Sequence, residues 1–401
     1  MRLTHLTLQQ YRNHASVDLD FDLERPLQYL VGPNAHGKTN ILEAIYLLAL
    51  TKSFRTSTQE DLIQWDQEYA RVKATLQTNR DTLELEIFLG NPPQPKRQLK
   101  KNGVKITAED FIGNCQIVFF HPEDLNILYL GPDLRRRYLD VMNIQLFKPY
   151  FRALKNYRRV HQQRNALLKN IKDGLASPQD LEIWDEQLVE HGALITAYRR
   201  YTLSFINRHL QNEYQSIAQK NEAASVKYVS NIWQNQYAEL PDDLSLPNES
   251  ELEEIKGMFT KALYQARPRD LHSLHTSVGP HRDDMELTLK DRPIASHASR
   301  GEVRSLLLAL KLLELTYHEH HTQEKPLLLL DDVFSELDED RQKMLMQTAE
   351  KGGHQTIITT THLDQRDPTT NVNPSSAAAS RPHQKLNILD ITKQAPKELR
   401  Y

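Results

Sequence analysis

The stretch that decides the fold reads Gly32-Pro33-Asn34-Ala35-His36-Gly37-Lys38-Thr39. It satisfies the pattern G-x-x-x-x-G-K-[ST], in which glycines let the backbone wrap closely around phosphate oxygens and the next helix adds its positive N-terminus. An apolar run, Leu27 to Val31, precedes it, and an apolar helical pattern, Ile41 to Ile45, follows it. The sequence therefore predicts a strand, a phosphate-binding loop and a helix.

This loop defines the first group of candidate site residues. All eight residues are expected to contact a nucleotide, with Lys38 reaching the β- and γ-phosphates and assisting catalysis. Thr39 is expected to hold Mg²⁺ through its hydroxyl. The expected cofactors are thus ATP and Mg²⁺.

A second apolar run, Leu327 to Leu330, ends in Asp331-Asp332. A continuous apolar run is typical of a strand buried on both faces of a parallel sheet. An apolar strand with a terminal carboxylate predicts that Asp331 holds Mg²⁺ and that Asp332 orients or activates the attacking water. Lys38 and Asp331 are 293 positions apart, which disfavours a GTPase or a small kinase because those keep the two motifs much closer.

The segment Ser299-Arg300-Gly301-Glu302 precedes an apolar helical pattern, Leu306 to Leu315. It resembles the signature of ABC-type ATPases, in which the serine and the helix N-terminus bind the γ-phosphate on a partner subunit. Ser299 and Gly301 are therefore candidate nucleotide contacts, and an ordinary helix-capping serine is the alternative. Ser335 to Asp338 resembles a D-loop, and Thr360-Thr361-His362 falls in the switch-histidine region.

Composition bounds the class of protein. The chain has 401 residues, 39% of them hydrophobic, and a single cysteine, Cys115. This apolar content excludes a disordered chain, and one cysteine excludes a disulfide scaffold and fits a reducing cytoplasm. No apolar run is long enough to span a membrane.

The charge is uneven along the chain. The net charge of −3 argues against a wholly basic nucleic-acid coat protein, yet ten basic residues and a single acid, Asp140, fall between Arg135 and Lys169. DNA phosphate contact is the functional interpretation, and a solvated helix face is the alternative. The candidate DNA-binding residues are Arg135, Arg136, Arg137, Arg152, Arg158, Arg159 and Arg164.

Pattern changes along the chain predict its organisation. Strands and turns dominate the first part, and long helical patterns follow. We expect an N-terminal part of an ATPase head, a helical insert, a C-terminal part of the head with signature and D-loop, a Pro/Ser/Ala-rich linker, and a final strand with a tail. Their bounds are 1–131, 132–270, 271–364, 365–383 and 384–401.

Taken together, these motifs resemble the RecF family over almost the whole length. The phrases that carry the resemblance include Tyr11-Arg12-Asn13-His14, Ser53-Phe54-Arg55, Phe120-His121-Pro122-Glu123-Asp124-Leu125, Gly279-Pro280-His281-Arg282-Asp283-Asp284 and Leu330 to Asp338. The resemblance implies an α/β fold: an ABC-type head, with a mixed sheet and an antiparallel β lobe, and an inserted α-helical domain.

The resemblance also implies function. It implies an ATP-driven homodimer that binds single-stranded and gapped DNA, helps to load recombinase in repair and replication, and works with a RecR-type mediator. Arg12 is a candidate nucleotide contact because it matches a family position near the P-loop. An Asp at position 332, shorter than Glu, favours slow hydrolysis that acts as a switch.

Departures from the family pattern concern the contacts with a partner subunit and the hydrolysis rate more than the class of protein. Arg300, Glu302 and Val303 stand where the signature is usually glutamine-rich, and His36 stands where glutamine is common. A related head ATPase of a defence or nuclease-control system is the runner-up. A scaffold that binds ATP without DNA is the third interpretation.

Overall fold

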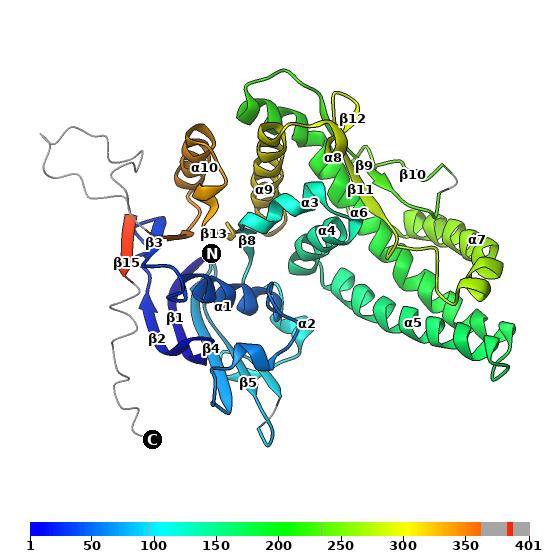
Figure 1. Cartoon of the computed structure of the whole chain (residues 1–401), viewed down its shortest axis with the longest axis horizontal. Coiled ribbons are helices and arrows are strands. Elements are labelled where there is room, and N and C mark those ends of the chain that lie inside the picture. The colour runs from blue at the N-terminus through cyan, green and yellow to red at the C-terminus, as the bar shows by residue number, and fades with distance from the viewer. Residues whose placement is uncertain (95, 234, 362–382, 388–401) are drawn as a thin grey trace, which may run out of the picture. The chain divides into compact units, whose positions relative to one another are not determined.

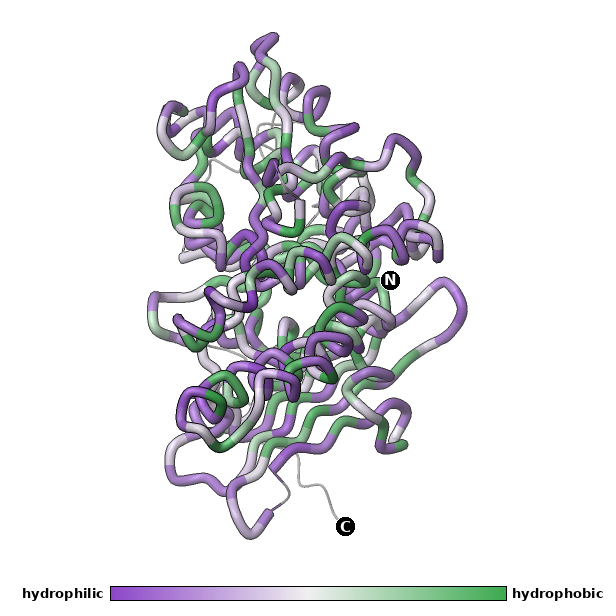
Figure 2. Tube along the Cα trace, turned by 90° about the vertical axis from the view of Figure 1, so that its right-hand side faces the viewer, coloured by the Kyte–Doolittle hydropathy of each residue, from purple (hydrophilic) through white to green (hydrophobic). Residues whose placement is uncertain are grey.

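The structure is a computed structural model and describes residues 1–94, 96–233, 235–361 and 383–387. It contains two compact units. The first comprises Met1–Pro122 and the described residues from Glu314 onward, and the second comprises Glu123–Leu313. Along both, hydrophilic and hydrophobic positions alternate, as expected of elements that bury one side (Figure 2).

A five-stranded parallel sheet forms the centre of the first unit. Its order is β15 (His383–Asn387), β3 (Leu27–Val31), β14 (Thr356–Thr360), β13 (Leu327–Asp331) and β8 (Ile117–Phe120). Every residue of β3, β13 and β8 is buried. The two apolar runs predicted as buried strands are therefore confirmed as β3 and β13.

The same unit holds a six-stranded antiparallel sheet. Its order is β2 (His14–Asp20), β1 (Arg2–Tyr11), β4 (Tyr69–Gln77), β5 (Thr82–Gly90), β6 (Arg97–Lys101) and β7 (Val104–Lys105). In β4 and β5 buried residues alternate with partly exposed ones. Asn102 and Gly103 turn β6 into β7 with φ of 50° and 78°, the left-handed values that this pair tolerates.

Helices complete the first unit (Figure 1). Helix α1 (Lys38–Leu50) follows β3, and its residues from Ile41 to Leu50 are all buried. The others are η1 (Glu60–Leu62), α2 (Ala108–Phe111), η4 (Val333–Ser335) and α10 (Glu339–Gly352). Burial raises the pKa of Cys115 to about 12, so this thiol is inert.

The second unit is mainly helical. Long antiparallel helices α5 (Lys148–Lys172), α6 (Leu181–Ala218) and α7 (Glu249–Ser273) pack together. The remaining helices are α3 (Asn126–Tyr129), α4 (Pro132–Leu146), η3 (Pro178–Asp180) and α8 (Ile294–His297). The boundary between the units falls within η2 (Pro122–Leu125) and again within α9 (Arg300–Thr322).

A small antiparallel sheet also belongs to the second unit. Its order is β10 (Tyr237–Ala238), β9 (Ala224–Val229), β11 (Asp284–Leu289) and β12 (Arg292–Pro293). The sequence did not predict β9 or β10. Strand β11 lies after residue 270 but pairs with β9, so it belongs to the same compact unit as the helices. The boundaries of the compact units therefore differ from those of the predicted domains. Those functional domain boundaries stay a prediction.

Two further observations bear on function. Among the described residues, no helix is long and apolar enough to cross a membrane. The Pro/Ser/Ala linker lies outside the described residues except for His383, whereas the predicted final strand is present as β15.

Candidate nucleotide-binding site

The phosphate-binding loop joins the end of β3 to the start of α1. Ala35 and Gly37 have φ of 66° and 88°, so the loop passes through left-handed conformations before α1 begins at Lys38. The Lys38 ammonium donates hydrogen bonds to the carbonyl oxygens of Gly32 (2.7 Å) and Pro33 (2.9 Å). Burial lowers the pKa of Lys38, while the charges of Asp332 and Asp331 raise it. The Lys38 ammonium group is thus held against the phosphate-binding loop.

The structure brings this loop to the carboxylate at the end of β13. Asp331 Oδ1 accepts a hydrogen bond from Thr39 Oγ1 at 2.9 Å and another from Thr359 Oγ1 at 2.8 Å. Asp331 and Thr359 are register partners on the neighbouring strands β13 and β14. A hydroxyl beside a carboxylate is the kind of oxygen donor set that Mg²⁺ uses together with phosphates and water. No pattern in the sequence singles out Thr359.

Asp332 follows Asp331 in a left-handed conformation, with φ of 50°. Its backbone N–H donates to Thr359 Oγ1 at 3.0 Å. Desolvation and then the neighbouring charge of Asp331 raise the pKa of Asp332. A carboxylate with a raised pKa is a better proton acceptor near neutral pH.

The segment Tyr11 to His14 packs against the P-loop. A Cβ added to Gly37 would lie 2.4 Å from His14 Nε2 and 2.6 Å from Asn13 Oδ1. His14 Nε2 also lies 3.1 Å from the Gly37 carbonyl oxygen, and Asn40 donates to Asn13 at 2.8 Å. Only glycine fits position 37, for reasons of both backbone conformation and space.

Arg12 lies beside α1 in a two-bond ion pair. Its Nε donates to Glu43 Oε2 at 2.8 Å and its Nη2 donates to Glu43 Oε1 at 2.6 Å. Glu43 is fully buried and also accepts a hydrogen bond from Ser53. The sequence did not identify Glu43, and contact of Arg12 with a nucleotide stays a prediction.

The candidate signature lies at the start of α9, in the second unit. Ser299 donates from both its backbone N–H and its hydroxyl to Glu302 Oε2 at 2.7 Å, and Glu302 N–H donates to Ser299 Oγ at 3.3 Å. This reciprocal arrangement is a capping box. The hydrogen bonds from Ser299 lower the pKa of Glu302. Ser299 therefore caps α9, and Gly301 follows within the first turn.

Other predicted elements fall close by in sequence. Asp338 caps α10 by accepting a hydrogen bond from the Arg341 N–H at 3.1 Å. His362 lies outside the described residues. The described residues contain no cluster of three or more His, Cys, Asp or Glu that could hold a metal, and His318, His320 and His321 form none.

The candidate DNA-binding arginines have different surroundings. Arg135 makes a two-bond ion pair with Asp284 at 2.6 and 2.7 Å. Arg136 donates to the Asp283 carbonyl oxygen at 2.6 Å, and Arg158 lies 3.2 Å from Asp140. The predicted arginines with exposed side chains are Arg137, Arg152, Arg158 and Arg159.

Arg164 corrects the predicted set. Its side chain is fully buried, and it donates to Asp185 at 2.7 Å and to Asp270 and Thr276 at 2.8 and 2.9 Å. A guanidinium in this position joins α5, α6 and α7 and does not reach a DNA backbone. Its helical spacing alone did not reveal which face of α5 is covered.

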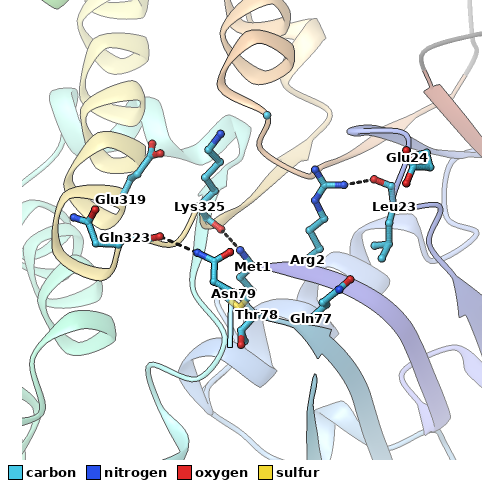
Figure 3. Close-up of a pocket in the computed structure, with 11 residues that line it drawn as sticks. Met1, Arg2, Leu23, Glu24, Gln77, Thr78, Asn79, Glu319, Gln323 and Lys325 are labelled. Atoms are coloured by element: carbon cyan, nitrogen blue, oxygen red, sulfur yellow. Dashed lines mark hydrogen bonds between the residues drawn. The ribbon is translucent and has the colours of Figure 1, made fainter. Parts of the chain in front are cut away.

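A hollow of about 520 Å³ lies elsewhere in the first unit (Figure 3). Its lining includes Leu23, Lys325 and Gly353, which precede β3, β13 and β14, so it lies at the amino ends of the parallel strands. Ligands of such sheets bind at the carboxyl ends, where the P-loop and Asp331 lie. Asn79 donates across the hollow to the Gln323 carbonyl oxygen at 3.1 Å. The hollow is therefore separate from the nucleotide site.

Known proteins resemble this chain over most of its length. The family described as the RecF/RecN/SMC N-terminal domain matches residues 2–372. The DNA replication and repair protein RecF of Streptococcus gordonii is 37% identical and covers 91% of this chain and 94% of its own. The RecF of Enterococcus faecalis is 35% identical, covering 91% and 93%.

Solved structures agree with these relatives. The structure described as the recombination mediator protein RecF-ATPrS in the RecFOR pathway superposes with a TM-score of 0.81 at 32% identity, covering 90% of this chain and 93% of that one. The corresponding RecF-ATP structure has a TM-score of 0.78 at 32% identity, covering 91% and 94%.

Proposed function

This chain belongs to the RecF family and has the ABC-type head fold of that family, and from this premise we propose that it is an ATP-dependent DNA-binding protein of recombinational repair and replication. The observation that carries the proposal is the hydrogen bond from Thr39 to Asp331. It joins two motifs from opposite ends of the chain into one oxygen-donor set beside a P-loop. ATP in the related RecF structures supports the same ligand for this loop.

The residues present fit a magnesium nucleotide. The loop N–H groups from Gly32 to Thr39 would cradle the phosphates, and Lys38 would exchange its two carbonyl acceptors for phosphate oxygens. Thr39 and Asp331 would hold Mg²⁺, which supplies charge neutralisation on the phosphates. Asp332 would orient the attacking water and accept its proton, and its short side chain favours slow turnover.

Dimerisation and partners belong to the same proposal. Ser299 and Gly301 would face the nucleotide of a second copy, because a helix N-terminus favours an anion. A RecR-type mediator and a cytoplasmic location rest on family membership alone. The cations proposed to meet gapped DNA are Arg135, Arg136, Arg137, Arg152, Arg158 and Arg159.

ATP-dependent dimerisation tests the sandwich arrangement. Sedimentation velocity with ATP and Mg²⁺ should show a dimer for the wild type and a monomer for Lys38→Met and for Ser299→Arg. Lys38→Met should also lose ATP binding, whereas Ser299→Arg should keep it, because Ser299 would act on the partner's nucleotide. If both variants still form ATP-dependent dimers as the wild type does, the two copies do not hold ATP between them in the proposed way.

Binding to gapped DNA tests the proposed function as a whole. We expect the wild type to bind a labelled gapped duplex more tightly with ATP than without it, and to lose affinity as salt rises. Affinity that is independent of both ATP and salt would contradict a repair role of this kind.

A further inference from the structure

The turn Gly279 to Asp284 is held rigidly inside the second unit. Gly279 has φ of +126°, and a Cβ there would lie 2.6 Å from Tyr157 Oη and 2.7 Å from Phe259 Cζ. Arg199 donates to the Pro280 carbonyl oxygen at 2.7 Å. Asp283 is fully buried and accepts a hydrogen bond from Tyr228. A turn braced on both sides presents its exposed residues in a fixed position.

Two histidines meet beside this turn. His281 uses both ring nitrogens, because Nδ1 accepts from Tyr157 Oη at 2.7 Å and Nε2 donates to the Thr276 carbonyl oxygen at 2.9 Å. Its ring centroid lies 4.1 Å from that of His161, on α5. Both ring nitrogens of His281 are thus occupied within the protein. Of the two histidines, His161 is the one that can still make a hydrogen bond to a ligand.

The hydrogen bonds of Asn165 determine which ring nitrogen of His161 carries the proton. Asn165 Oδ1 accepts from both the N–H and the hydroxyl of Thr276 at 2.8 Å, which turns its Nδ2 towards His161 Nε2, 3.3 Å away. Nε2 is then the acceptor, so Nδ1 of the neutral ring carries the proton. Within the described ranges, this Nδ1 has no hydrogen-bond partner.

Positive charge gathers at the same place. Arg282 is exposed at the tip of the turn and has no ion pair within the parts of the chain that are described. Burial lowers the pKa of His161, and the charges of Arg164 and Arg282 lower it further. Arg282 and Arg136 similarly oppose a charge on His281. A surplus of positive charge with a spare N–H donor is suited to an anion.

Cations lie on α5 on both sides of His161 in the sequence. The helix contains no Asp or Glu in its 25 residues and is about 37 Å long, close to one turn of DNA. Exposed α5 cations that make no ion pair with any described residue are Lys155, Arg159, Lys169 and Lys172. No large hydrophobic side chain of α5 is exposed, so this face lacks the apolar centre that a protein partner would use.

We propose that Arg282 and His161 form the anchor for one backbone phosphate of DNA, and that the solvent-facing cations of α5 contact the same strand on both sides of that anchor. The inference rests on the proposed DNA-binding function and deepens it by naming the surface. The rigid turn fixes where the strand meets the protein, and α5 fixes its direction. It also adds Arg282, His161, Lys155, Lys169 and Lys172 to the residues that meet DNA.

Fluorescence anisotropy with a labelled gapped duplex, ATP and Mg²⁺ tests this surface between 50 and 200 mM salt. We expect Arg282→Ala to weaken binding by about 5-fold or more and to reduce the salt slope by about 0.9, the value for one phosphate contact. The double variant Lys155→Ala/Arg159→Ala should reduce the slope by about twice as much. Arg292→Ala removes an exposed arginine of the same unit and is the matched control, expected to stay within about twofold of the wild type.

The outcomes separate the two levels of the proposal. If the wild type binds gapped DNA and both the Arg282 and the α5 variants bind equally well, the surface is wrong and the proposed function stands. If the wild type does not bind gapped DNA, the proposed function itself fails. Displacement of the duplex by poly-glutamate as effectively as by unlabelled DNA of equal charge would point to an acidic protein partner and overturn the assignment. The α5 variants keep the test valid if Arg282→Ala does not fold.

Discussion

At the scale of single residues, Glu302 has a consequence for dimerisation. Its carboxylate lies 2.7 Å from Ser299 Oγ, at the helix end proposed to meet the γ-phosphate of a partner. Two negative groups at one helix N-terminus repel each other, whereas glutamine can fill the same capping position without charge. We expect Glu302→Gln to tighten the ATP-dependent dimer by about 5- to 30-fold, the effect of roughly 1–2 kcal/mol.

Sedimentation equilibrium with ATP measures that change. Glu249→Gln is the control, because Glu249 lies in the first turn of α7 and so occupies the start of a helix outside the signature. It should leave the dimer dissociation constant unchanged. A Glu302→Gln dimer no tighter than the wild type would mean that the carboxylate does not oppose the phosphate.

His318 predicts how stability depends on pH. It is fully buried, neither ring nitrogen has a hydrogen-bond partner among the described residues, and burial lowers its pKa to about 3. In the unfolded chain the His318 imidazole has a pKa near 6.5. Between about pH 6.5 and pH 3 it therefore binds a proton in the unfolded chain but not in the folded chain. Stability contributed by the neutral ring is lost as pH falls below about 6.5, by roughly 2 kcal/mol between pH 7 and pH 5.

Urea unfolding followed by circular dichroism at pH 7, 6 and 5 measures this dependence. His318→Phe should unfold with a smaller loss of free energy on acidification than the wild type, because its ring has no proton to gain. His36→Phe replaces an exposed histidine and should keep the wild-type dependence. Equal pH dependence in the wild type and His318→Phe would show that His318 does not titrate on unfolding.

At the scale of elements, local pattern was enough for some and not for others. The apolar runs of β3 and β13 and the apolar helix α9 were predicted, because each depends on residues next to one another. Strand β9 was missed because its partner, β11, lies far along the chain. A local sequence pattern does not predict pairing between strands that are far apart in the chain. For the same reason it does not predict where the compact units begin and end.

Two glycines on neighbouring helices predict opposite effects of alanine. A Cβ on Gly192 of α6 would lie 2.4 Å from Phe259 and 3.0 Å from Tyr157, whereas one on Gly257 of α7 meets nothing within 4 Å. Overpacking costs about 1–3 kcal/mol, while alanine in an open helical position gains about 0.5–1 kcal/mol over glycine. We expect Gly192→Ala to lower the melting temperature and Gly257→Ala to raise it.

Differential scanning calorimetry of the two variants measures the signs. A double variant, Gly192→Ala/Phe259→Ala, should lose less than the sum of its single changes, because removal of the Phe259 ring relieves the clash. Both glycine variants should bind ATP as the wild type does, since Gly192 and Gly257 lie in the second unit. If the losses of stability in the two single variants add up in the double variant, a Cβ at position 192 does not clash with the Phe259 ring.

At the scale of the whole molecule, the two ends of the chain build one nucleotide site. The motifs predicted P-loop and carboxylate separately, and their order predicted a head assembled from both ends. The partners of Lys38 and Arg164 were not predictable, because burial depends on which helix face is covered. The net charge of −3 is likewise an average that conceals α5, which has no acidic residue.

This assembly predicts where ATP should stabilise the chain. Bound nucleotide at about 100 times its Kd stabilises the folded state by about 2.7 kcal/mol, and the effect falls first on the elements that hold it. Hydrogen exchange in the Ser299→Arg background, which we expect to stay monomeric, should therefore slow in β3, α1 and β13 when ATP and Mg²⁺ are added. Lys38→Met in the same background should show no slowing. Because the second unit has its own core, exchange in α5, α6 and α7 should not change; equal slowing there would mean that the two units open together.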